Sequence, residues 1–144
     1  MRTIETTVYT IDEHPNPEKC FEWIRSNWHD LNDHSAAEAV GSIKALSEAI
    51  GGSVDYVISA VASQGEFIRF RDYSHEELMA LDADSCPLTG VCWDADLIRG
   101  LISGEPENML HSLHADTEYV YSDEGLRDLC EANRYEFTED GKFL

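Results

Sequence analysis

Positively charged residues are scarce in this sequence. Ten lysines and arginines stand against 29 aspartates and glutamates, so the formal net charge is −19 in 144 residues. A protein that binds DNA, RNA or anionic lipid needs a basic surface to grip phosphate groups. No such surface can be built here, so we expect no direct binding to nucleic acid or to a membrane. Ordinary small domains carry a net charge of roughly 2–8 in magnitude, and this excess acidity needs an explanation.

Long hydrophobic runs are absent as well. There is no run of about 18 apolar residues and no basic and apolar leader before a small-residue cleavage site, so we expect neither a membrane span nor a signal peptide. The sequence therefore predicts a cytoplasmic protein. Cysteine is sparse, with four unevenly spaced residues, which favours reduced and mostly buried thiols over a disulfide framework.

Catalytic signatures are missing too: there is no nucleophile elbow, phosphate-binding loop or dinucleotide-binding glycine pattern. Cys86, Cys92, His111 and His114 form a candidate zinc set, but the spacing of each pair departs from that of structural zinc sites. Neighbouring negative charge also raises thiol pKa values and disfavours a nucleophilic cysteine. We expect no enzyme activity, cofactor or metal; a small metal-dependent hydrolase that uses these residues or a carboxylate pair stays as an alternative.

Two aspartate pairs, Asp82 with Asp84 and Asp94 with Asp96, have the alternate spacing of calcium loops. An EF-hand loop also needs an oxygen ligand at position five and glycine at position six, and neither stretch supplies them. Aspartates in the first turn of a helix interact favourably with the helix dipole. We interpret both pairs as charge at helix N-termini.

Patterns of β-branched and aromatic residues predict strands at the start, middle and end of the chain. The first covers about residues 3–11, and two more, within residues 54–61 and 65–73, form a hairpin with a four-residue connection. Residues 134–144 form a last hairpin with a turn at Asp140 and Gly141.

Apolar residues at helical spacing predict several helices between these strands. Ser35 and Ser74 each begin a capping box, and Ser122 precedes a helix with two acids in its first turn. The predicted helices cover residues 16–31, 35–50, 74–81, 94–103 and 122–133. The sequence thus predicts an α+β fold, a small mostly antiparallel β-sheet packed against several α-helices, in a single domain over residues 1–144.

The acidity is concentrated in the second half of the sequence. Residues 1–71 hold 11 acids and 6 bases, whereas residues 72–140 hold 18 acids and 3 bases. Self-repulsion at this density destabilises a compact protein, which indicates that the charge serves a purpose. The proteins of a salt-adapted cell are acidic throughout and need no such asymmetry; halophilic adaptation stays as an alternative.

Three stretches carry a resemblance to known sequences: "VYTIDEHPNPEKCFEWIR" near the start, "CPLTGVCWDADLI" in the middle and "ANRYEFTEDGKFL" at the end. Together they resemble a family of small acidic proteins encoded by bacteriophages and prophages. In that family a first strand with an aromatic helix, a Cys-x-x-Thr-Gly loop before an acidic helix, and a terminal hairpin recur. The resemblance implies a viral or mobile-element origin and carries over no catalytic residue.

A negatively charged surface can itself be the functional feature. Proteins that grip DNA offer tracks of lysine and arginine to its phosphates, and carboxylates at i,i+4 on a helix lie about 6 Å apart, so they can occupy such a track. Tyrosines add contact area of a kind enriched in protein interfaces. The predicted partner-binding residues are Glu105, Glu107, Asp116, Glu118, Tyr119, Tyr121, Asp123, Glu124, Asp128 and Glu131.

The resemblance and the charge together suggest an inhibitor of a host defence system, such as an anti-CRISPR or anti-restriction protein. It would act as a DNA mimic in the bacterial cytoplasm, bind a basic nucleic-acid-binding protein (a CRISPR effector subunit or a restriction enzyme) and block access of DNA. The main alternative is an antitoxin or regulatory module that covers its partner by shape, with apolar contacts and salt-tolerant affinity.

Overall fold

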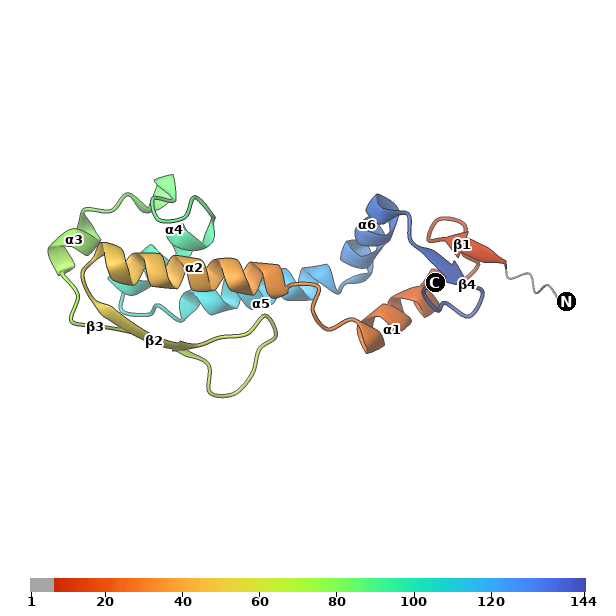
Figure 1. Cartoon of the computed structure of the whole chain (residues 1–144), viewed down its shortest axis with the longest axis horizontal. Helices are drawn as coiled ribbons and strands as arrows, with labels where there is room; N and C mark the ends of the chain where they lie inside the picture. The colour runs from red at the N-terminus through yellow and green to blue at the C-terminus, as the bar shows by residue number, and fades with distance from the viewer. Residues whose placement is uncertain (1–6) are drawn as a thin grey trace, which may run out of the picture. The chain divides into compact units, whose positions relative to one another are not determined.

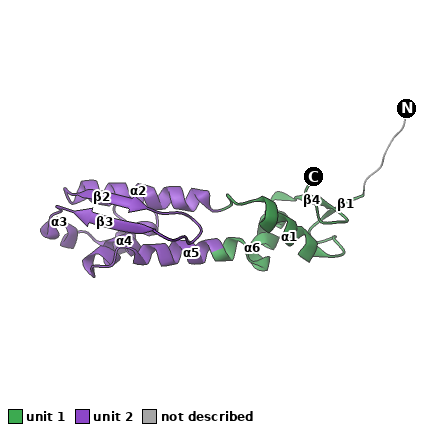
Figure 2. Ribbon diagram, turned by 90° about the horizontal axis from the view of Figure 1, so that it is seen from below, with its two compact units in different colours: residues 1–31, 118–144 green, residues 32–117 purple. Residues whose placement is uncertain are grey.

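The computed structural model describes residues 7–144 and confirms the α+β class (Figure 1). These residues form six α-helices and two antiparallel sheets of two strands each. They fall into two compact units: unit 1 combines residues 1–31 with 118–144, and unit 2 covers residues 32–117 (Figure 2). The single domain over 1–144 stays a prediction. Residues 3–6 of the predicted first strand lie outside the described part of the chain.

Unit 2 is built on a long helix, α2, which packs against α4 and against strand β2. Ile43 and Leu46 of α2 and Ile50, the residue that follows its last turn, recur at three and four residues and are fully buried, which is the face the periodicity predicts. The elements of unit 2 are α2 (Asp33–Ala49), β2 (Ser53–Val57), β3 (Phe67–Arg71), α3 (His75–Met79), the 3₁₀ helix η1 (Ala83–Ser85), α4 (Trp93–Ile102) and most of α5 (Asn108–Val120).

The start of α2 differs from the prediction. The helix begins at Asp33, so Ser35 is already inside it and its hydroxyl donates to Asp116 Oδ2 (3.3 Å). The predicted capping box at Ser35 is therefore wrong, and the Glu38 carboxylate instead lies 3.0 Å from His34 Nε2 on the same helix. The predicted cap at Ser74 is confirmed, because its hydroxyl accepts the backbone N–H of Glu77 (3.2 Å).

The central hairpin has a longer connection than the sequence predicts. β2 and β3 pair in antiparallel register from Ser53 opposite Arg71 to Val57 opposite Phe67. The connection between them is residues 58–66, not four residues, because the chain leaves the ladder early to make other contacts. Within unit 2, the backbone carbonyl of Ala60 accepts the Thr117 hydroxyl of α5 (2.7 Å).

Unit 1 brings the two ends of the chain together. β1 (Val8–Thr10) pairs with β4 (Glu136–Thr138) in an antiparallel ladder, with Tyr9 opposite Phe137. α1 (Pro17–Asn27) packs against α6 (Asp123–Asn133) over a core that includes Phe21 and Ile24. The predicted turn at Gly141 is present: its N–H donates to Thr138 O (2.9 Å) and its backbone is left-handed, with φ 87°, a conformation that favours glycine.

Along residues 7–144, no helix has both the length and the apolar character required to cross a membrane.

Candidate partner-binding surface

An acidic row lies on the exposed face of α6 in unit 1. The helix buries Leu126 and Cys130 on one side and leaves Glu124, Asp128 and Glu131 exposed on the other. These three acids are spaced by four and three residues, which places them on one face of a helix. None of them pairs with a lysine or arginine in the described part of the chain. We call these three residues the α6 acidic row.

The N-terminus of α6 is held by its cap and by an arginine from α1. Ser122 accepts the backbone N–H of Gly125 (3.1 Å), and Asp123 lies in the first turn, where the helix dipole favours an anion. Arg25 contacts Asp123 Oδ1 (2.5 Å) and donates to the backbone carbonyl of Tyr121 (2.9 Å). Hydrogen bonding to Arg25 lowers the pKa of Asp123. Asp123 therefore has an arginine partner within unit 1, whereas no acid of the α6 acidic row forms an ion pair with a lysine or arginine of the described residues.

Two carboxylates from the start of the chain crowd this part of unit 1. Glu18 of α1 contacts Asp123, and this hydrogen bond between two acids raises the pKa of Glu18. Asp12 contacts Glu131 in the same way and raises the pKa of Glu131. A carboxyl group that holds its proton more readily beside another acid is a sign of local like-charge repulsion.

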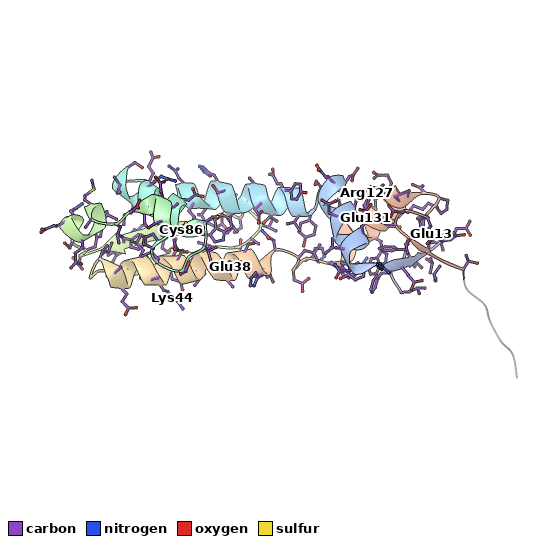
Figure 3. The ribbon with its side chains drawn as sticks, turned by 90° about the horizontal axis from the view of Figure 1, so that it is seen from above. Glu13, Glu38, Lys44, Cys86, Arg127 and Glu131 are labelled. Carbon is purple, nitrogen blue, oxygen red and sulfur yellow. The ribbon has the colours of Figure 1, made fainter. Side chains whose placement is uncertain are left out.

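A hollow of about 420 Å³ lies beside the acidic row, between α1 and α6. Phe21 contributes an apolar wall, and the guanidinium of Arg127 lies 5.7 Å from the centre of its ring. Arg127 and Glu131 lie on neighbouring turns of α6 (Figure 3). Arg127 Nη1 is also 3.7 Å from Asp12 Oδ1. The hollow therefore combines an apolar surface with a carboxylate rim.

The predicted interface tyrosines have different roles. Tyr119 is 48% exposed, and its hydroxyl donates to Asp128 Oδ2 (3.2 Å), which raises the pKa of Tyr119. Tyr121 is half-buried, and its hydroxyl accepts the backbone N–H of Leu31 (3.1 Å). Tyr119 can thus contact a partner beside the acidic row, while Tyr121 contributes to the packing of unit 1. Glu118, the remaining predicted residue of this unit, is exposed on α5.

The other predicted acids belong to unit 2. Glu105 and Glu107 are exposed in the connection between α4 and α5, and Glu105 Oε2 accepts the side-chain amide of Asn108 (3.0 Å). Asp116 is half-buried on α5 and accepts the Ser35 hydroxyl. These three acids are not part of the row on α6.

Asp94, which the sequence predicts only as charge at a helix N-terminus, is a buried carboxylate with a structural role that the sequence does not reveal. Its side chain is fully buried at the start of α4. One carboxylate oxygen accepts the hydroxyls of Ser42 (2.6 Å) and Thr89 (2.9 Å). The other accepts three backbone N–H groups, from Leu88, Thr89 and Gly90, at 2.6–3.0 Å.

These contacts make Asp94 the centre of the loop that carries the sequence "CPLTGVC". Burial alone would raise the pKa of Asp94, but the hydrogen bonds from Ser42, Thr89 and Gly90 outweigh it and lower that pKa. Asp94 therefore shapes the loop between η1 and α4, beyond the helix-terminal charge that its position indicates.

The candidate zinc residues are not brought together. His114 Nε2 lies 3.0 Å from Glu66 Oε2, and both side chains are largely buried. Burial would raise the pKa of Glu66, but hydrogen bonds from Ser59 and the charge of His114 outweigh it and lower that pKa. Between residues 7 and 144, no three His, Cys, Asp or Glu side chains gather as a metal site.

The four cysteines are free thiols. Cys20 and Cys130 are buried in the core of unit 1, and burial raises the pKa of each to about 11. Cys86 is half-buried and Cys92 is exposed. A thiol with a raised pKa is a poor nucleophile, so the buried pair packs as small apolar side chains.

The arrangement in unit 1 suits binding of a cationic surface. It combines an unpaired row of carboxylates, repulsion between neighbouring acids, an apolar hollow and an exposed tyrosine. Comparisons of this chain with protein-family models, with curated proteins and with solved structures find no match.

Proposed function

We propose that this protein is an inhibitor that binds a basic, nucleic-acid-binding surface of another protein and blocks access of DNA. It acts by binding, without catalysis. The observation that carries the proposal is the α6 acidic row: Glu124, Asp128 and Glu131 are exposed on one helix face, and no lysine or arginine of the described residues pairs with them.

The local electrostatics favour a cationic partner. Contacts between Glu18 and Asp123 and between Glu131 and Asp12 raise the pKa of one acid in each pair. Such repulsion costs stability in the free protein. Arg25 already contacts Asp123 and Arg127 lies near Asp12, so the other acid of each pair, Glu18 or Glu131, is the one without a lysine or arginine partner among the described residues. A cationic group of another protein can supply that partner on binding.

The spacing of the row suits a surface that evolved to hold DNA. Carboxylates at i,i+4 on a helix are about 6 Å apart, and a DNA-binding protein presents lysine and arginine at intervals that match a phosphate backbone. A rigid helix keeps its carboxylates at fixed intervals, as a duplex does with its phosphates. The exposed Tyr119 adds amphipathic contact area beside the row.

The resemblance to small acidic phage and prophage proteins supports a bacterial defence protein as the target. CRISPR effectors and restriction enzymes both carry basic channels for nucleic acid. Opposite charges accelerate association over long range, which suits an inhibitor that has to reach a nuclease before the nuclease reaches phage DNA. The partner is therefore a basic defence protein of the bacterial host.

A capture experiment with a charge-neutralised variant tests the proposal. The full chain and the triple variant E124Q/D128N/E131Q are immobilised, exposed to a bacterial lysate and washed at about 0.05 M and about 0.5 M NaCl, conditions that differ severalfold in screening. We expect the wild type to retain a nucleic-acid-binding protein at low salt and to release it to competing duplex DNA. The triple variant should lose that protein.

The control removes the same number of charges from the same unit. Glu136, Glu139 and Asp140 are exposed at the C-terminal strand and turn, and E136Q/E139Q/D140N should retain the partner. Equal loss in both triple variants would mean that net charge alone matters. A partner held by the α6 variant, or held as strongly at high salt, would favour the shape-based alternative over a DNA mimic.

A further inference from the structure

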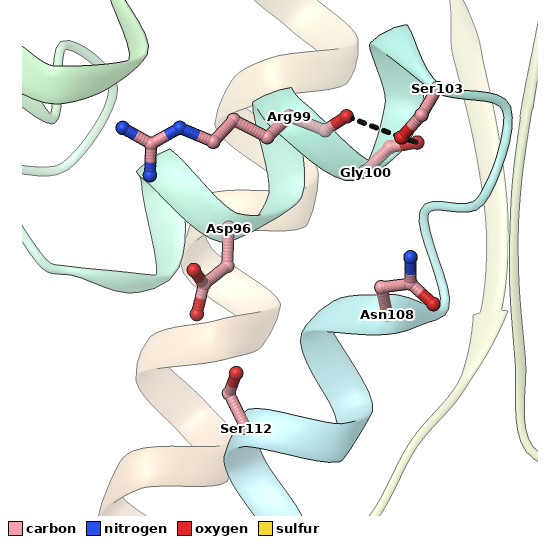
Figure 4. A pocket seen from close by; sticks show the side chains of 6 residues that line it. All are labelled: Asp96, Arg99, Gly100, Ser103, Asn108 and Ser112. Atoms are coloured by element: carbon pink, nitrogen blue, oxygen red, sulfur yellow. Dashed lines mark hydrogen bonds between the residues drawn. The ribbon is translucent and has the colours of Figure 1, made fainter.

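A polar hollow of about 260 Å³ lies in unit 2 between α4 and α5 (Figure 4). The volume is below the roughly 300–1,000 Å³ of pockets that bury drug-sized ligands, and it suits a group the size of one side chain. Gly100 lies in its wall: a Cβ there would come within 2.8 Å of the Glu105 carbonyl. The close passage of the chain past Gly100 therefore helps to form the hollow.

Hydrogen-bond acceptors dominate the lining. Asp96 is half-buried, and among residues 7–144 no group donates a hydrogen bond to its carboxylate or forms an ion pair with it. The side-chain N–H₂ group of Asn108 donates a hydrogen bond to Glu105 Oε2 (3.0 Å), and no described residue donates to its side-chain carbonyl oxygen. The Ser103 hydroxyl donates to the backbone carbonyl of Arg99 (2.8 Å), so its oxygen lone pairs also remain.

Arg99, the positively charged residue at the edge of the hollow, already has an acidic partner. Arg99 forms an ion pair with Asp84 of η1, and Figure 4 shows its guanidinium pointing away from Asn108 while Asp96 and Ser112 point toward each other. The space between α4 and α5 thus offers an unopposed carboxylate, a hydroxyl and an amide oxygen. A ligand that fits must bring several N–H donors and a positive charge.

We propose that this α4–α5 hollow is a receptor for a guanidinium group, supplied by an arginine side chain of the protein partner. A guanidinium presents five N–H donors in a planar fork, which can reach several acceptors at once, whereas an ammonium is a compact, strongly hydrated charge. Asp96 provides the charge, and Asn108 and Ser112 fix the orientation. The identity of the donor as a partner's arginine rests on the proposed function; the affinity of the hollow for a guanidinium does not.

The test uses N-acetyl-arginine amide as the probe and the ¹⁵N-labelled full chain. We expect saturable NMR shift changes at residues 96, 100, 103, 108 and 112, including the side-chain amide of Asn108. Asp96→Asn should weaken binding about tenfold, the loss expected for one charge-assisted hydrogen bond. N-acetyl-lysine amide should bind more weakly than the arginine probe.

The control is Asp33→Asn, which removes one exposed charge from the first turn of α2 in the same unit and should leave the affinity unchanged. Equal binding by wild type and Asp96→Asn, equal affinity for both probes, or shift changes spread over every exposed acid would each overturn the proposal. None of these results depends on the α6 acidic row, so a failure here leaves the capture experiment of unit 1 unaffected. Likewise, a failure of the capture experiment leaves the test of guanidinium binding unaffected.

Discussion

Asp94 and Asp96 lie two positions apart on α4, yet the fold uses their carboxylates in opposite ways. Asp94 is fully buried and accepts hydrogen bonds from Ser42, Thr89 and two further backbone N–H groups. Asp96 is half-buried beside a hollow and accepts none from the described residues. The first carboxylate stabilises the fold, and the second is available to a ligand.

Asp94→Asn should destabilise unit 2 by on the order of 3 kcal/mol, since it removes charge-assisted hydrogen bonds and turns an N–H₂ group toward backbone donors. The measurement is the free energy of unfolding by urea, with Asp96→Asn as the matched control. We expect the control to stay within about 0.5 kcal/mol of wild type, because Asp96 is only half-buried and accepts no hydrogen bond from the described residues. Equal effects at the two positions would contradict the assignment of Asp94 as the loop anchor.

The stabilising effect of Asp94 should also depend on pH. The folded-state pKa of Asp94 is lowered, so its contribution is present above the unfolded value of about 4 and is lost as pH falls through the lower folded value. The difference in unfolding free energy between wild type and Asp94→Asn should therefore be full near neutral pH and shrink under acidic conditions. If the difference in unfolding free energy between wild type and Asp94→Asn grew on acidification, the folded-state pKa of Asp94 would be raised and not lowered, which would contradict the prediction.

Most local residue roles were predictable from the sequence, and distant ones were not. The cap at Ser74 and the exposed row on α6 depend on neighbours within four positions, and their spacing predicts them. The same spacing at Ser35 predicts a cap that is absent, because α2 already begins at Asp33. The roles of Asp94, which is bound by Ser42 from 52 positions away, and of Arg25, which meets Asp123 across 98 positions, depend on tertiary contacts. No local pattern contains that information.

At the scale of elements, two glycines inside helices show how packing can outweigh the helix propensity of a residue. Gly41 lies inside α2, and a Cβ built there meets nothing within 4 Å. Gly125 lies in the first turn of α6, where a Cβ would be 2.1 Å from the carbonyl oxygen of Tyr119. The same substitution should therefore have opposite effects in the two helices.

Gly41→Ala should stabilise the protein by about 0.5–1 kcal/mol, the ordinary gain for alanine over glycine in a helix. Gly125→Ala should destabilise it by about 1–3 kcal/mol, a typical cost of overpacking, because the α5–α6 turn has to open. Thermal unfolding of both variants followed by circular dichroism measures the two signs. A stabilised Gly125→Ala would show that the turn is looser than the structure has it.

The sequence predicted five of the six helices but not α5 (Asn108–Val120), and it predicted connections and sheet partners less well. The periodicity of α2, α4 and α6 is set by the core that each helix covers, so it is visible in the sequence. The pairing of β1 with β4 joins the two ends of the chain, and residues 58–66 form a long connection because Ala60 and Glu66 have partners on α5. Both features depend on contacts between segments that are far apart in sequence.

At the scale of the whole molecule, the charge asymmetry along the sequence does not survive folding. Unit 1 takes both chain ends and carries 14 acids and 6 bases, a net charge of −8; unit 2 carries 15 acids and 4 bases, a net charge of −11. With 58 and 86 residues, the two units have a similar charge per residue. The uneven charge of the two sequence halves is therefore no longer an argument against halophilic adaptation. The response to salt has to distinguish halophilic adaptation from binding of a basic partner.

Folding and partner binding should respond to salt in opposite directions. Raising NaCl from about 20 mM to about 0.3 M shortens the Debye length several-fold and screens self-repulsion at net −19, so the Tm should rise by a few degrees. The same screening weakens attraction to a basic partner, so capture by wild type should fall steeply over that range. Calorimetry of the free protein, alongside capture at matched salt, measures both trends. A halophilic protein would instead be unfolded at the low end and need far higher salt to fold, whereas an inhibitor that works by charge must be folded and bind most tightly at that low end.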